Sequence, residues 1–290
     1  MIENTFTLGN SKHLVATVTV PSGRAAGDNA PMAVLTNSGV ISRAGPHRMN
    51  VHLARRLAAR GIPSIRFDMS GLGDSRRGES ALPQVQQWVL DTRTVMDFAQ
   101  QHTGCSRFFM VGFCSGAEVG YRTALEDERM RAVLLWDMYA YPTLQSSIRT
   151  FVFRLQRAGA IGVLRKIVGR LKVRLSSAPS GAPQDGNQRQ LRDLEPSRVP
   201  PKDEFAGDIQ RLCDRGVELM FMFSGGEPDW YNYRRQFRDA FAQHKFVERI
   251  PCELLEISDH LVTRRPAQAA FLSEFEHWLD ARVLPALNRA

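Results

Sequence analysis

Apolar and polar positions alternate in two rhythms along the chain, and each rhythm predicts a kind of element. Residues 13–20 alternate with period two, as a half-buried strand does, and residues 1–30 together predict an edge hairpin followed by a loop. Residues 31–39 are a short apolar run ending in small polar residues, which favours a buried strand that feeds a loop. An apolar stripe with helical spacing then covers residues 49–58 and stops at Gly61.

The same alternation of elements continues through most of the chain. Further strands are predicted at 62–68, 107–113, 131–137, 217–226 and 252–257, and helices at 88–96, 115–126, 231–243 and 269–284. Strands that alternate with helices at this spacing predict the α/β class, with a mostly parallel sheet covered by helices on both faces.

Residues 140–205 interrupt this pattern. Apolar positions between 148 and 171 have helical spacing with a soft break at 158–162, so we expect two amphipathic helices, followed by a Ser-, Gly- and Pro-rich linker at 176–188. The sequence thus divides into a core, 1–139 and 206–290, and an inserted helical segment, 140–205.

The charge of the chain is concentrated in that insertion. The net charge is +8, from 38 Lys and Arg against 30 Asp and Glu. Eight basic residues and no acidic residue lie between positions 144 and 184. The remaining residues carry 30 basic and 30 acidic side chains, so the composition does not mark the protein as a nucleic-acid binder.

Cysteine usage and hydropathy bear on the compartment. Four cysteines are scattered with neither CxxC pairs nor the spacing of a disulfide framework, which favours reduced thiols in a cytoplasmic protein. Residues 1–14 lack an apolar core of signal-peptide length, and no window offers the roughly 20 apolar residues of a membrane span. We therefore expect a cytoplasmic location and no transmembrane segment.

The stretch "VGFCSGAEVG" at 111–120 is the main candidate for chemistry. A strand, a Gly-x-nucleophile-x-Gly turn and a helix form a nucleophile elbow, in which residues two before and two after the nucleophile must be small. For Cys114 these residues are Gly112 and Gly116, whereas Ser115 would place Phe113 at a crowded position. The pattern favours Cys114, and the alternative is a cysteine buried beneath the sheet.

The chain here resembles the α/β-hydrolase superfamily. Besides the elbow, a D-x-x-G-x-G-x-S pattern falls on Asp68, Gly71, Gly73 and Ser75. Residues 36–48 with 53–61 are similar to bacterial hydrolases associated with exosortase and exopolysaccharide loci, in the serine-aminopeptidase-like branch. The cysteine elbow is similar to that of dienelactone hydrolase at that position alone. The resemblance implies an eight-stranded α/β-hydrolase fold and a lid formed by the insertion.

The same resemblance implies a triad in the order nucleophile, acid, histidine. His260 follows the last predicted strand, where the family places its base. The family's G-x-x-D pattern makes Asp229 the expected acid, with Glu227 next and Asp137 a weaker candidate. Asp259 is expected to point away.

The expected oxyanion donors are the backbone N–H groups of Ser115 and Val40. This chain has Ser38–Gly39 where many relatives have His-Gly. Arg43, His47 and Arg48 either contact an anionic group of the substrate or cap and solvate the first helix.

These residues predict a cysteine acyl hydrolase or thioesterase that acts through an acyl-cysteine intermediate. Two alternatives stay open: an acyltransferase that passes the acyl group to an amine or alcohol, and a catalytically silent scaffold. No metal, dinucleotide or other cofactor is expected. The substrate is a small acyl compound, and an acidic acyl carrier protein presenting it would contact basic residues of the insertion: Arg165, Lys166 and Arg170. Two alternatives to a carrier protein involve the same basic face. It is either the solvent-exposed side of a lid or a contact with anionic membrane lipid.

Overall fold

The computed structural model describes residues 1–23, 31–78, 80–157 and 199–289. Within them the centre is one eight-stranded sheet in the order β1-β2-β4-β3-β5-β6-β7-β8. The strands are β1 (Ile2–Leu8), β2 (Leu14–Val20), β3 (Met32–Leu35), β4 (Ser64–Asp68), β5 (Phe108–Phe113), β6 (Met130–Trp136), β7 (Glu218–Ser224) and β8 (Cys252–Leu255). The pairs β1–β2 and β2–β4 are antiparallel and the other pairs are parallel. The predicted mostly parallel sheet with an N-terminal edge hairpin is confirmed.

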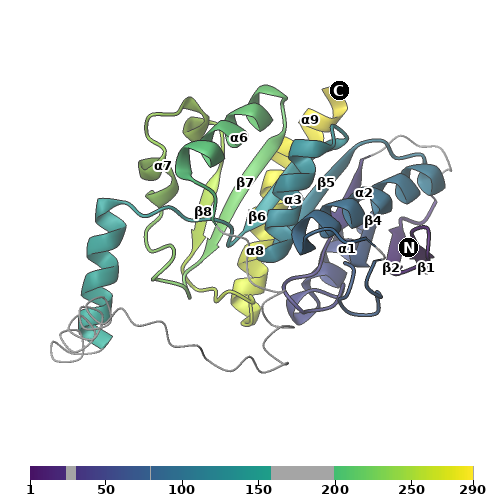
Figure 1. The fold of residues 1–290 in the computed structure, drawn as a ribbon, viewed down its shortest axis with the longest axis horizontal. Coiled ribbons are helices and arrows are strands. Elements are labelled where there is room, and N and C mark those ends of the chain that lie inside the picture. The colour runs from purple at the N-terminus through teal and green to yellow at the C-terminus, as the bar shows by residue number, and fades with distance from the viewer. Residues whose placement is uncertain (24–30, 79, 158–198, 290) are drawn as a thin grey trace.

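Helices cover both faces of this sheet (Figure 1). The α-helices packed on the sheet are α1 (Met49–Ala59), α2 (Gln84–Thr103), α3 (Ser115–Glu126), α6 (Lys202–Asp214), α7 (Gln236–Ala240), α8 (Arg265–Trp278) and α9 (Leu284–Arg289). Short turns of other helix types are η1 (Pro46–Arg48), η2 (Lys245–Glu248) and η3 (Leu279–Val283).

Two apolar layers hold the helices to the sheet. One layer joins α2, α3, α6 and α7 to one face, and the other joins α1, α8, η3 and α9 to the opposite face. The central strands β5 and β6 are almost wholly buried, because side chains on both faces meet helices. Phe113 and Trp136, one from each strand, pack on Phe271 of α8. This packing fixes the ends of β5 and β6, where the candidate site lies.

The segment after β7 differs from the sequence expectation. A helix was predicted over 231–243, but α7 spans only Gln236–Ala240. Tyr231 instead stacks its ring on Phe223 with centroids 3.8 Å apart, and the Asn232 side chain donates hydrogen bonds to carbonyl oxygens. These side-chain contacts hold the first residues as a loop, since they replace the hydrogen bonds that a helix would supply.

Part of the inserted segment lies within the described residues. Residues 144–157 are helical and stand at one end of the molecule, beyond the β8 side of the sheet (Figure 1). Several of their apolar side chains are exposed: Leu144, Ile148, Phe151, Val152 and Leu155. The second expected helix and the linker lie outside the described residues, so a lid stays a prediction.

Candidate active site

Cys114 occupies the turn between β5 and α3. Its backbone is in an uncommon conformation, with φ 53° and ψ −117°. A Cβ added at Gly112 would lie 2.4 Å from the Gly116 carbonyl oxygen, and one at Gly116 would lie 2.4 Å from Thr36 Oγ1. Both positions therefore exclude a side chain, which confirms the expected steric reason for the two glycines.

His260 meets Asp137 beside this turn. Its Nδ1 lies 2.8 Å from Asp137 Oδ2, and the Asp137 side chain is 3% exposed. His260 follows β8, whereas Asp137 directly follows β6. Since β6, β7 and β8 are parallel neighbours, their carboxyl ends lie at one edge of the sheet, and the loops that leave them bring the two side chains together.

The imidazole of His260 also hydrogen-bonds the Cys114 side chain. With Nδ1 directed at Asp137, Nε2 is the ring nitrogen left for the sulfur. Hydrogen bonds to Asp137 and then Cys114 raise the pKa of His260 to about 10, although burial of the ring opposes this. The contacts with Asp137 and Cys114 therefore make the imidazole of His260 more basic than a free imidazole.

The backbone around Asp137 aims its carboxylate. Asp137 has φ 49°, and its N–H donates to the Met222 carbonyl at 2.8 Å. Its second oxygen, Oδ1, accepts the Ser224 N–H at 2.7 Å. On the other side, Trp136 Nε1 donates to the His260 carbonyl at 2.9 Å. Asp137 and His260 are thus both held by hydrogen bonds to neighbouring strands.

The expectation that Asp229 orients His260 is corrected by this geometry. Asp229 lies on the loop after β7, and its carboxylate accepts a hydrogen bond from Arg154 Nε at 2.8 Å. Both side chains of that pair are more than half exposed. Asp229 lines a cavity of about 400 Å³ together with Phe151 and Trp230. The loop therefore turns Asp229 outward, towards helix 144–157.

The loop after β3 reaches the elbow. Ser38 and Ile41 close a tight turn through a 2.9 Å hydrogen bond between the Ile41 N–H and the Ser38 carbonyl. Gly39, at φ 53°, donates its N–H to Ser115 Oγ at 3.0 Å. Val40 stands at the tip of the turn and is 69% exposed. The two expected oxyanion donors, on Ser115 and Val40, thus belong to segments joined by a hydrogen bond.

The family follows from a comparison with known proteins. A family model described as serine aminopeptidase, S33, matches residues 32–198, more than half of the chain. The chain belongs to this S33 family. A search among curated proteins finds no match.

Solved structures show the fold of this S33 family member. A candidate α/β hydrolase of unknown function from Agrobacterium tumefaciens shares 12% identity over 99% of this chain and 98% of that one, with a TM-score of 0.54. A candidate dienelactone hydrolase from Klebsiella pneumoniae shares 13% identity over 97% and 98%, with a TM-score of 0.57. A hypothetical protein from Pseudomonas aeruginosa shares 16% identity over 97% of this chain and 93% of that one, with a TM-score of 0.58. The fold is the α/β-hydrolase fold, as expected, and the family indicates a hydrolase.

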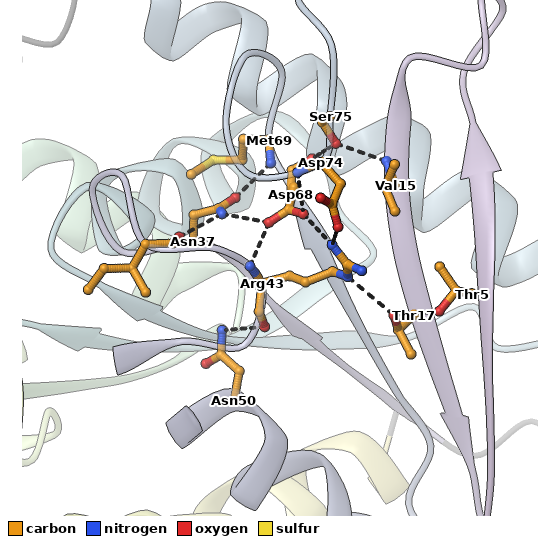
Figure 2. A network of polar contacts seen from close by, with 11 residues as sticks. Thr5, Val15, Thr17, Asn37, Arg43, Asn50, Asp68, Met69, Asp74 and Ser75 are labelled. Atoms are coloured by element: carbon orange, nitrogen blue, oxygen red, sulfur yellow. Dashed lines mark hydrogen bonds and ion pairs between the residues drawn. The ribbon is translucent and has the colours of Figure 1, made fainter. Parts of the chain in front are cut away.

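The guanidinium of Arg43 in this S33 family member is paired with two carboxylates (Figure 2). Its Nη1 lies 2.5 Å from Asp68 Oδ2 and 2.6 Å from Asp74 Oδ2, and its backbone N–H donates to Asp68 Oδ1 at 2.5 Å. Asn37 Nδ2 donates to the same Asp68 oxygen at 2.9 Å. A Cβ at Gly73 would lie 2.4 Å from the Asp68 carboxylate. The D-x-x-G-x-G-x-S motif therefore anchors the loop after β3, and Arg43 is already paired rather than free for a substrate.

The remaining predicted contact residues divide into two groups. His47 and Arg48 are exposed, both have positive φ, and neither caps α1 with its side chain. The pKa of the Asp259 carboxyl is below its ordinary value. Burial raises this pKa, but hydrogen bonds, mainly from Thr263, outweigh burial, and the nearby His47 lowers the pKa further. The basic residues expected to face a partner, Arg165, Lys166 and Arg170, lie outside the described residues.

Neither a metal site nor a membrane-spanning helix is found among the described residues. In the described part of the chain, no group of three or more His, Cys, Asp and Glu side chains is arranged to hold a metal ion. Across the same residues, no helix has the length and apolar character needed to cross a membrane.

Proposed function

We propose that the protein is a cysteine acyl hydrolase in which Cys114, His260 and Asp137 act as nucleophile, base and orienting acid. The observation that carries this proposal is the hydrogen-bonded chain from the Cys114 sulfur through His260 to Asp137, built on a strained strand-to-helix turn. A buried structural cysteine has no need of such a turn, nor of an imidazole held by a buried carboxylate.

Acylation follows from this geometry. The Cys114 proton moves to His260 Nε2, and the sulfur attacks the acyl carbon of a small ester or thioester. The carbonyl oxygen becomes negative, and the backbone N–H groups of Ser115 and Val40 are the proposed donors that hold it. When the intermediate collapses, the carbonyl re-forms, the carbon–leaving-group bond breaks and the imidazolium gives its proton to the leaving group. An acyl-thioester remains on Cys114.

Deacylation returns the enzyme to its starting state. His260 takes a proton from water, which attacks the thioester carbon, and the Cys114 sulfur leaves as the acid is released. Amines and thiols open a thioester more readily than an ordinary oxygen ester. A cysteine nucleophile therefore suits a thioester substrate, and transfer to an amine or alcohol is the competing outcome of the same intermediate.

An acidic acyl carrier protein is a proposed source of the acyl group. The proposal rests on the basic character of the insertion, where eight Lys and Arg occur without Asp or Glu. Binding of such a carrier would weaken steeply as salt is added, because the contact would be electrostatic.

Intact-protein mass spectrometry tests the proposal. The protein is mixed briefly with a panel of acyl thioesters and aryl esters and quenched with acid. We expect one acyl adduct, located on Cys114 by peptide mapping and missing in Cys114→Ala. Decay of that adduct in water, compared with decay in the presence of an amine, separates hydrolysis from transfer. A panel that leaves no adduct on Cys114 and no product in solution would favour the silent scaffold.

A further inference from the structure

The hydroxyl of Ser115 connects the two halves of the candidate oxyanion hole. Ser115 is the first residue of α3 and follows Cys114 directly. Its Oγ accepts the N–H of Gly39 at 3.0 Å, across 76 positions of sequence. Ser115 itself has one of the two proposed oxyanion N–H donors. Gly39 directly precedes Val40, which has the other.

The loop that presents Val40 needs such a connection. The turn from Ser38 to Ile41 is closed internally, and behind it Asn37 and Arg43 fix the loop to Asp68. These contacts hold the base of the loop. Within the described residues, the hydrogen bond from the Gly39 N–H to Ser115 Oγ links the tip of the turn to α3. Its length therefore sets the distance between the two donors.

We propose that the Ser115 side chain is a positioning group that holds the Val40 N–H at oxyanion distance from the Ser115 N–H. This inference rests on the proposed function of Cys114. It gives the serine beside the nucleophile a role other than attack, since His260 hydrogen-bonds Cys114 and the Ser115 hydroxyl is turned to Gly39. A displaced donor loses stabilisation of the transition state more than of the bound substrate, because charge develops on the oxygen only as the bond forms.

Two reactions of Cys114 separate this role from general damage to the site. Acylation by p-nitrophenyl acetate passes through an oxyanion and needs the hole. Alkylation by iodoacetamide replaces iodide at a saturated carbon, so it needs the thiolate but no oxyanion hole. A positioning role for Ser115 predicts that its loss slows the first reaction and spares the second.

The experiment compares Ser115→Ala and Ser115→Thr with wild type and with Ser273→Ala, an exposed serine on α8. Thermal unfolding first confirms that each variant is folded. Ser115→Ala is expected to lower kcat for p-nitrophenyl acetate about 10- to 100-fold, less than complete loss of a donor, with KM unchanged. Iodoacetamide alkylation of Cys114 stays within about twofold. Ser115→Thr, which keeps the hydroxyl, and Ser273→Ala retain both rates.

Three results would overturn the inference. Acylation by Ser115→Ala at the wild-type rate or faster would mean that the hydroxyl is not needed, or that it blocks the Gly39 N–H. Acylation and alkylation falling together would place the defect in Cys114 and His260. A Ser115→Thr variant as slow as Ser115→Ala would remove the role of the hydroxyl. Failure of the proposed function is separate, because wild type itself would then form no acetyl adduct on Cys114.

Discussion

His260 and Asp137 lie 123 positions apart in the chain, yet Nδ1 of one and Oδ2 of the other are 2.8 Å apart. The carboxylate is buried and also accepts the Ser224 N–H at 2.7 Å. With both of its oxygens engaged, it cannot rotate away without losing a hydrogen bond. The imidazole therefore has a fixed orientation, with its second nitrogen towards Cys114.

Replacing Asp137 tests whether this contact serves catalysis. Asp137→Asn keeps the shape and the bond from Ser224 but removes the charge that favours the imidazolium. We expect kcat for p-nitrophenyl acetate to fall by roughly 100-fold or more, since the histidine loses both its tautomer control and its charge partner. Asp229→Asn is the matched control, because Asp229 is exposed and paired with Arg154.

Steady-state kinetics of the two variants decides between the two acids. The geometry predicts that Asp229→Asn stays within about twofold of wild type, as a substitution on an exposed loop should. A large loss in Asp229→Asn with little change in Asp137→Asn would restore the acid expected from the sequence.

The raised pKa of His260 predicts a pH dependence of stability. The ordinary value is 6.5 and the folded value is about 10, so the folded protein binds this proton more tightly. The stabilisation from His260 is complete below about pH 6.5, declines as the pH rises, and is lost above about pH 10. Urea unfolding of wild type and His260→Gln between pH 6 and 10.5 measures it. We expect the stability difference between the two proteins to shrink steadily across this window. A difference that is constant or grows with pH would contradict the assignment.

The fold and the elbow that presents Cys114 could be predicted from the sequence because their signals are local. Apolar runs and helical stripes predict the order of elements, and neighbouring elements then form the sheet. The elbow is equally local: the requirement for small residues falls on Gly112 and Gly116, two positions either side of Cys114. His260 could be singled out from the sequence for a related reason, because it is the histidine that follows the last strand.

The acid could not be chosen in this way. Asp137 and Asp229 each follow a buried strand, and β6 and β7 are neighbours in the sheet. Which carboxylate faces the histidine depends on the direction in which each chain leaves its strand. Asp137 adopts φ 49° and turns inward, whereas the loop of Asp229 extends to Arg154. The usable signal was that Asp137 is the first polar residue after an apolar strand, directly at the carboxyl edge.

The glycines of the elbow predict an effect on stability. Gly112→Ala puts a Cβ 2.4 Å from the backbone oxygen of Gly116, which cannot move without shifting α3. We expect a loss of about 1–3 kcal/mol in the free energy of unfolding, and displacement of Cys114. Gly207→Ala is the control: Gly207 lies inside α6 with no heavy atom within 4 Å of the added Cβ. It should stabilise the protein by about 0.5–1 kcal/mol, because alanine favours a helix. Urea unfolding measures both, and equal effects would contradict the steric argument.

The contact between Arg43 and Asp68 predicts a second, larger effect on stability that extends to the loop after β3. Asp68 is fully buried. In Arg43→Met its carboxylate therefore loses its cationic partner and keeps only hydrogen bonds from backbone N–H groups and Asn37. We expect a loss of about 2–4 kcal/mol in the free energy of unfolding. Arg154→Met breaks an ion pair of which both side chains are more than half exposed, and should cost about 0–1 kcal/mol.

Amide hydrogen exchange of a peptide covering residues 36–43 gives the local measurement. Exchange there should be faster in Arg43→Met than in Arg154→Met, because Arg43 ties this loop to β4. If exchange over 36–43 is the same in both variants while stability falls, the ion pair supports the core and not the loop of the proposed oxyanion donor.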